Sequence, residues 1–141
     1  MIEVDILDDI AKGVENDIMA AIQKGTSDGL MALALNAQAD AQRSILKGPK
    51  TGKLYKRGDT MHRASADGEA PANDLSFLVA SIKAEETDAN TVDLKADAPY
   101  AMALEFGTYD MAARPYLGPA GDKARRQGPE VIDAYVKAAL K

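Results

Sequence analysis

The most constraining feature of this sequence is a run of β-branched aliphatic residues that recurs at every fourth position near its start. Ile6, Ile10, Val14, Ile18 and Ile22 follow one another at this spacing, with acidic and polar residues between them. Because residues four apart lie on the same face of an α-helix, the run predicts a long amphipathic helix.

Two helices are expected in the first third of the chain. Residues 25–29 contain two glycines and predict a turn, with Ser27 or Asp28 as the N-cap of the next helix. That helix is expected over residues 30–46, ended by the Gly-Pro pair at 48–49. Its apolar face is rich in alanine, which allows close approach to a sheet or to another helix: Leu30, Leu33, Ala34, Ala37, Ala41 and Ile45.

The second half of the chain predicts a β-hairpin. Val92, Leu94 and Ala96 alternate with polar residues, which is the period-two pattern of a half-buried strand. A second strand is expected over residues 81–87, and residues 88–90 form the turn between the two.

Further helical segments flank this hairpin. Asn73 or Asp74 is expected to cap a short helical turn before it, and residues 99–107 predict a short helix after it. A last helix is expected over residues 120–141, with a break at Gly-Pro 128–129.

The chain length of 141 residues fits a single domain, 1–141. The predicted class is α+β, with N-terminal helices and a C-terminal helix packed on a small antiparallel sheet and a long basic loop or hairpin. Charges interrupt every apolar run, so no membrane span is expected. The acidic start is unlike a secretory signal, and we expect a cytoplasmic location.

Charge is distributed unevenly along the chain, whose net charge is -5. Residues 2–17 are strongly acidic and contain Lys12 as their only cation, whereas residues 47–63 are strongly basic and contain Asp59 as their only anion. Opposite charges on separate segments suit head-to-tail contacts between copies. The acidic helix could instead face a DNA channel or be an ordinary solvated surface.

The basic stretch lies in a glycine-rich segment, about residues 48–72, that is expected to be a mobile excursion or hairpin. Three roles are open for it: an arm that contacts an acidic protein surface, an uninvolved loop, or a DNA contact in which an aromatic lies among cations. The residues of this candidate arm are Lys50, Lys53, Tyr55, Lys56, Arg57, His62 and Arg63.

Composition removes much of enzyme chemistry. The chain has no cysteine and a single histidine, His62. A histidine beside Asp67 and Glu69 suggests acid–base chemistry, but it lies in the glycine-rich segment and is expected to be solvated or at an interface. Asp8 and Asp9 are adjacent, so they point apart on a helix and make a poor metal pair. We expect no catalytic residue, no metal and no cofactor.

Two linked blocks carry the most specific signal, APYAMALEFGT at residues 98–108 and MAARPYLGPA at 111–120. Together they resemble the signature of the phage head–tail joining (neck, tail-completion) protein family of long-tailed bacteriophages. The resemblance extends upstream to HRASA at 62–66 and GEAPA at 68–72, which precede an L…SI element at 78–82.

The chain departs from the family pattern at Asp67 and Ala112, where proline is frequent, and at Gly118, often a basic residue. The motif residues to which the resemblance gives a structural or assembly role are Pro99, Tyr100, Leu104, Glu105, Phe106, Gly107, Thr108, Arg114, Pro115, Tyr116, Leu117 and Pro119.

These residues also have a physical interpretation. Pro99 fixes the entry to a short helix and Gly107 permits a sharp exit from it, while Pro115 and Pro119 stiffen the run that follows. Glu105 and Arg114 are close enough in sequence to pair across the turn. Packing against the sheet, or else direct subunit contact, is expected for Tyr100, Leu104, Phe106, Tyr116 and Leu117.

The resemblance implies a non-enzymatic virion protein of a phage or prophage, located in the neck and assembled in the bacterial cytoplasm. Copies would form a homo-oligomeric ring, with six favoured over twelve, between the connector or stopper and the tail-terminator proteins. Double-stranded DNA would pass through it without specific binding. The alternatives are a tail terminator or other minor tail protein, or a small DNA-associated accessory protein that uses residues 47–63.

Overall fold

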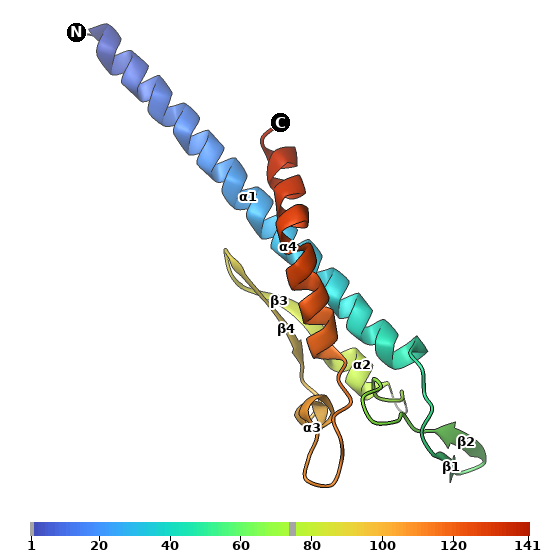
Figure 1. Cartoon of the computed structure of the whole chain (residues 1–141). Coiled ribbons are helices and arrows are strands. Elements are labelled where there is room, and N and C mark those ends of the chain that lie inside the picture. The colour runs from blue at the N-terminus through green and yellow to red at the C-terminus, as the bar shows by residue number, and fades with distance from the viewer. Residues whose placement is uncertain (1, 74–75) are drawn as a thin grey trace.

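The fold is α+β, as predicted, in a computed structural model that describes residues 2–73 and 76–141. Two antiparallel hairpins, β1–β2 and β3–β4, lie among four helices (Figure 1). In chain order the elements are α1 (Ile2–Lys47), β1 (Leu54–Arg57), β2 (Thr60–Arg63), α2 (Phe77–Ser81), β3 (Ile82–Asp88), β4 (Thr91–Ala96), α3 (Ala101–Phe106) and α4 (Leu117–Ala139).

Helix α1 is continuous, so the turn predicted at residues 25–29 is wrong. At the usual rise per residue its 46 residues span about 70 Å. The glycines stay helical because α4 crosses α1 there: a Cβ on Gly25 would lie 2.6 Å from the Cα of Val136, and one on Gly29 would lie 3.2 Å from the Cα of Ile132. They allow two backbones to approach closely.

The N-cap expected at Ser27 or Asp28 is also wrong, since no helix begins there. The Asp28 carboxylate instead pairs with Lys24, one turn earlier, at 2.5 Å. Ser27 Oγ donates to the Glu86 carboxylate of β3. Both side chains therefore lie on the surface of a continuous helix and form contacts there.

A matched pair of substitutions tests this close crossing. Gly25→Ala is expected to lower the free energy of unfolding by about 1–2 kcal/mol, because overpacking outweighs the helix propensity of alanine. Gly13→Ala, with nothing within 4 Å of the added Cβ, is expected to raise it by about 0.5–1 kcal/mol. Urea denaturation measures both. Equal stabilisation by the two changes would rule out the close approach of α4.

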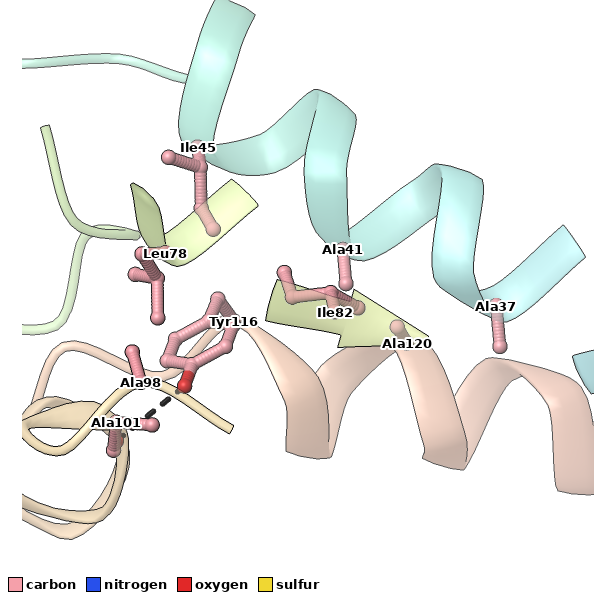
Figure 2. Packing of buried hydrophobic residues seen from close by; sticks show 9 residues of the cluster. All are labelled: Ala37, Ala41, Ile45, Leu78, Ile82, Ala98, Ala101, Tyr116 and Ala120. Carbon is pink, nitrogen blue, oxygen red and sulfur yellow. Dashed lines mark hydrogen bonds between the residues drawn. The ribbon is translucent and has the colours of Figure 1, made fainter. Parts of the chain in front are cut away.

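The core lies where the second half of α1 meets α4, β3 and the segment around α3 (Figure 2). The alanine-rich face predicted for residues 30–46 is confirmed at Leu33, Ala34, Ala37, Ala41 and Ile45, which are buried, while Leu30 is half-buried. Small side chains on this face bring the α4 backbone close. The buried cluster consists of Ala37, Ala41, Ile45, Leu78, Ile82, Ala98, Ala101, Tyr116 and Ala120.

The predicted β-hairpin is confirmed as β3–β4, with a register that runs from Ile82 opposite Ala96 to Asp88 opposite Thr91. The sheet lies against α1, where the Gln38 side chain accepts a hydrogen bond from the Ala84 amide at 2.8 Å. A polar side chain of the helix thus satisfies a backbone donor of the strand.

The helical turn expected before the hairpin is α2. Its N-cap is Ser76, so the cap expected at Asn73 is wrong; the Asn73 side chain instead accepts a hydrogen bond from the Ser76 amide at 3.1 Å. Asp74, the other expected cap, and Leu75 lie outside the described residues. The short helix expected over 99–107 is α3, which ends at Gly107 as predicted.

The last helix differs from the prediction at two places. It begins at Leu117, three residues early, and continues through Pro129 without the expected break. Gly128 is buried in the interface with α1, where a Cβ would lie 3.8 Å from Leu33. Tertiary packing therefore holds this helix through a sequence that would end an isolated one. None of the described helices has an apolar stretch long enough to cross a bilayer.

Candidate functional site

The two motif blocks form a junction between α3 and α4. Glu105, in the last turn of α3, accepts hydrogen bonds from the amides of Tyr116, Leu117 and Gly118 at 2.7–2.9 Å. The first amides of a helix have no partner within it, and an anion there also favours the helix dipole. Glu105 is therefore a cap supplied by a different helix, which explains why α4 begins at Leu117.

Arg114 does not pair with Glu105, contrary to the sequence prediction. Its guanidinium donates to the carbonyl oxygen of Ser65 and, at 2.6 Å, to Ser65 Oγ. Asp67 lies 4.0 Å from the same guanidinium. The Glu105 carboxylate is bound by three amides at the start of α4, so the two side chains bind different partners. Arg114 ties the second motif block to the loop after β2.

A backbone contact reinforces this tie, because the Gly68 amide donates to the Ala113 carbonyl at 3.0 Å. Among the residues that the structure describes, Ser65 is the one polar residue that is buried. The role of Ser65 was missed in the sequence, although its block, HRASA, is part of the resemblance. The two motif blocks, HRASA and GEAPA therefore meet in one structural unit.

Packing of the motif side chains is only partly as predicted. Tyr116 is buried in the core, and its hydroxyl donates to the Ala101 carbonyl at 3.3 Å (Figure 2). Burial, with the nearby charge of Glu105, raises the pKa of Tyr116 to about 12. Leu104 and Leu117 pack against the same cluster.

Two of the predicted anchors do not pack inside. Phe106 is 77% exposed and Tyr100 is 45% exposed. Phe106 is the last residue of α3 and Tyr100 is its N-cap. This helix is too short to bury every apolar side chain that it carries. The prediction that they anchor α3 on the sheet is wrong, and the alternative of subunit contact stays open for them.

Glycine and proline set the path between the blocks. Gly107 has φ +79° and ψ 174°, and its amide donates to the Ala103 carbonyl. The Thr108 amide then donates to the Met111 carbonyl at 2.8 Å, which closes the loop. Pro119 lies in the first turn of α4, where a missing amide proton costs nothing. Pro99 and Pro115 lie just before α3 and α4.

The basic excursion contains a hairpin, β1–β2, at the far end of the molecule from the N-terminus (Figure 1). Tyr55 lies opposite His62 in this hairpin, and their rings stack with centroids 6.0 Å apart. Arg63 donates to the Gly52 carbonyl. Lys50 donates to the Ser44 carbonyl, and burial lowers the pKa of Lys50, opposed by the charge of Glu69. The remaining cations of the candidate arm are Lys53, Lys56 and Arg57.

Glu69 fixes the two ends of the excursion together. Its carboxylate accepts hydrogen bonds from the amide and hydroxyl of Thr51 and from the amide of Ala66, at 2.6–2.9 Å. These bonds, the Thr51 hydroxyl first, lower the pKa of Glu69 from 4.5 to about 2. Glu69 stands in the GEAPA stretch, and its position near His62 in the sequence suggested only an acid–base group.

A pH prediction follows from Glu69. Because its pKa is lower in the folded than in the unfolded chain, its contribution to stability is complete above pH 4.5 and is lost as the pH falls toward 2. Glu69→Gln is expected to remove this part of the acid dependence of the unfolding midpoint, measured between pH 2 and 6. Glu130→Gln on the exposed surface of α4 is the control and should leave that part in place. An unchanged acid profile in Glu69→Gln would contradict the assignment.

The first half of α1 extends beyond the body of the molecule (Figure 1). The apolar face predicted there has Ile10, Val14, Ile18 and Ile22 exposed by 56, 52, 46 and 37%, and Leu7 beside it is 67% exposed. Ile6 has no described side chain. The sequence predicted the apolar face, but nothing in a periodic pattern indicates whether the rest of the chain covers it.

An apolar cavity of about 510 Å³ lies near the opposite end. It lies between the β1–β2 hairpin, α2 and α3, and its lining includes Tyr55, Phe77, Tyr100, Met111 and Arg114. Among the described residues, no group of three or more histidine or carboxylate side chains could hold a metal ion.

Comparison with family models, with curated proteins and with solved structures gives no significant match to this chain.

Proposed function

We propose that this chain is a structural subunit of the neck of a long-tailed bacteriophage, forming a ring between the DNA-filled head and the tail. The observation that carries the proposal is the extension of the acidic first half of α1, with an uncovered apolar face, away from a body whose opposite end is basic. A protein that acts alone gains nothing from such an exposed face. A subunit that assembles uses it.

The motif blocks support the proposal in a second way. Glu105 and Arg114 act on backbone amides and on Ser65, so they fix the angle between α3, α4 and the loop after β2. Closure of a ring depends on a constant rotation from one copy to the next, which a rigid junction supplies. In this role the chain has no catalytic residue, cofactor or metal.

Electron microscopy of particles made by the phage or prophage that encodes the chain tests the proposal. We expect a ring of this chain, with six copies favoured over twelve, between portal and tail. Deletion of the gene is expected to leave filled heads and separate tails. Particles with a complete neck and no copy of this chain would refute the proposal, while a ring one position lower would make it a tail terminator.

A DNA-associated accessory role is the second candidate, and the stacked Tyr55 and His62 among the cations of β1–β2 favour it. It predicts binding of single-stranded DNA that weakens steeply as salt is raised. Fluorescence anisotropy with a labelled oligonucleotide at about 50 and 200 mM salt measures this. The neck role predicts no binding of consequence at either salt concentration.

A further inference from the structure

The apolar face of the first half of α1 has the spacing of a docking helix. We define the stripe as Leu7, Ile10, Ala11, Val14 and Ile18, of which the four larger side chains are about half exposed or more. Leu7, Ile10 and Val14 stand at positions i, i+3 and i+7, the spacing at which an amphipathic helix inserts anchors into an apolar groove. The stripe therefore has the form of a ligand for a groove.

Carboxylates border this stripe on both sides. At 100° per residue, Asp8 and Glu15 fall along one edge and Asp17 along the other. Glu15 lies beside Val14 and Ile18 in a shallow apolar hollow of this helix. A groove complementary to this stripe must therefore offer an apolar floor with a basic border.

The far end of the same chain has these properties. The cavity of about 510 Å³ has an apolar lining that includes Phe77, Tyr100 and Met111. Tyr55 of the basic hairpin and Arg114 also line it. Phe77 is 55% exposed, and its ring lies 6.4 Å from that of Tyr100, so an aromatic pair stands open at the entrance.

We infer that the stripe of one copy docks in this cavity of the next copy, with the acidic borders of α1 against the basic β1–β2 hairpin. The inference rests on the proposed function and names its copy-to-copy contact. The two surfaces lie at opposite ends of the molecule (Figure 1), so the contact is head-to-tail and one copy can hold two neighbours. Pairing of two stripes in a symmetric dimer is disfavoured because it would bring Glu15 and Asp17 of both copies together, whereas Asp8 already pairs with Lys12.

Three variants of the full chain test the inference by sedimentation. The double change Ile10→Gln/Val14→Gln removes the stripe while keeping good helix formers. Phe77→Glu places a negative charge at the entrance of the cavity. Both are expected to weaken self-association at least about tenfold. Leu35→Gln, at a 50% exposed position on the same helix, is the control and should leave it unchanged. Circular dichroism verifies that each variant is folded.

Mixing the two weakened variants distinguishes the two geometries. A head-to-tail contact predicts a 1:1 dimer in the mixture, because the Phe77→Glu copy keeps its stripe and the double variant keeps its cavity. Self-association of Phe77→Glu at wild-type strength would overturn the inference in favour of paired stripes. A wild-type chain that stays monomeric at every concentration would also overturn the inference. It would leave the neck role intact, because a ring can be assembled on the portal. Microscopy of particles tests that role separately.

Discussion

Replacement of Tyr116 by alanine is expected to remove about 3–5 kcal/mol of stability, because Tyr116 is the largest fully buried side chain of the described residues. It is 2% exposed and lies among Ile45, Leu78 and Ile82, so its removal leaves a cavity that helices from both ends of the chain surround (Figure 2). Most domains are stable by only about 5–15 kcal/mol. Urea denaturation should therefore show a much lower unfolding midpoint for this variant than for the wild type.

Two controls separate the ring of Tyr116 from its hydroxyl and from tyrosine in general. Tyr116→Phe keeps the ring and loses only the bond to the Ala101 carbonyl, so about 0.5–1.5 kcal/mol is expected. Tyr109→Ala changes a fully exposed side chain and should stay within about 0.5 kcal/mol of the wild type. If Tyr116→Ala were no less stable than Tyr109→Ala, the described core would be wrong.

The elements of the fold that depend on local pattern were predictable. The β3–β4 hairpin follows from alternation around Val92 and Leu94, and the buried face of α1 follows from the spacing of its alanines. The continuity of α1 through Gly25 could not be predicted, because glycine is destabilising in an isolated helix and is favourable here only where α4 crosses. The unbroken path of α4 through Pro129 could not be predicted either, because packing against α1 outweighs the tendency of proline to end a helix.

The candidate site was predictable in its residues and not in its contacts. The motif blocks identified Glu105 and Arg114, whose closeness in sequence predicted an ion pair. Their actual partners are the first amides of α4 and Ser65, the latter 49 positions away in the chain. Pairing is decided by which donors the fold brings within reach, and a sequence pattern contains no such distances. The sequence could not predict that the stripe on α1 is exposed, for the same reason.

Gly107→Ala is expected to cost about 2–4 kcal/mol, because two effects add at this position. The backbone angles of Gly107, φ +79° and ψ 174°, lie in a region that only glycine occupies readily. A Cβ there would also lie 2.8 Å from both the Ala113 nitrogen and the Met111 oxygen. The loop between the motif blocks would have to move, and with it the hydrogen bond from the Arg114 amide to the Leu104 carbonyl.

Gly68→Ala is the matched control, since Gly68 has nearly the same φ, +80°, but nothing within 4 Å of an added Cβ. It shares the positive φ without the collision, so about 1 kcal/mol is expected. The larger loss expected in Gly107→Ala therefore reports the collision in the loop after α3 together with the strain at ψ 174°. A tight loop holds the angle between α3 and α4, and Gly107→Ala particles should then show fewer complete necks than Gly68→Ala particles by electron microscopy. Equal losses of stability in the two variants would mean that the loop adapts freely and that Gly107 is needed only for its backbone angles.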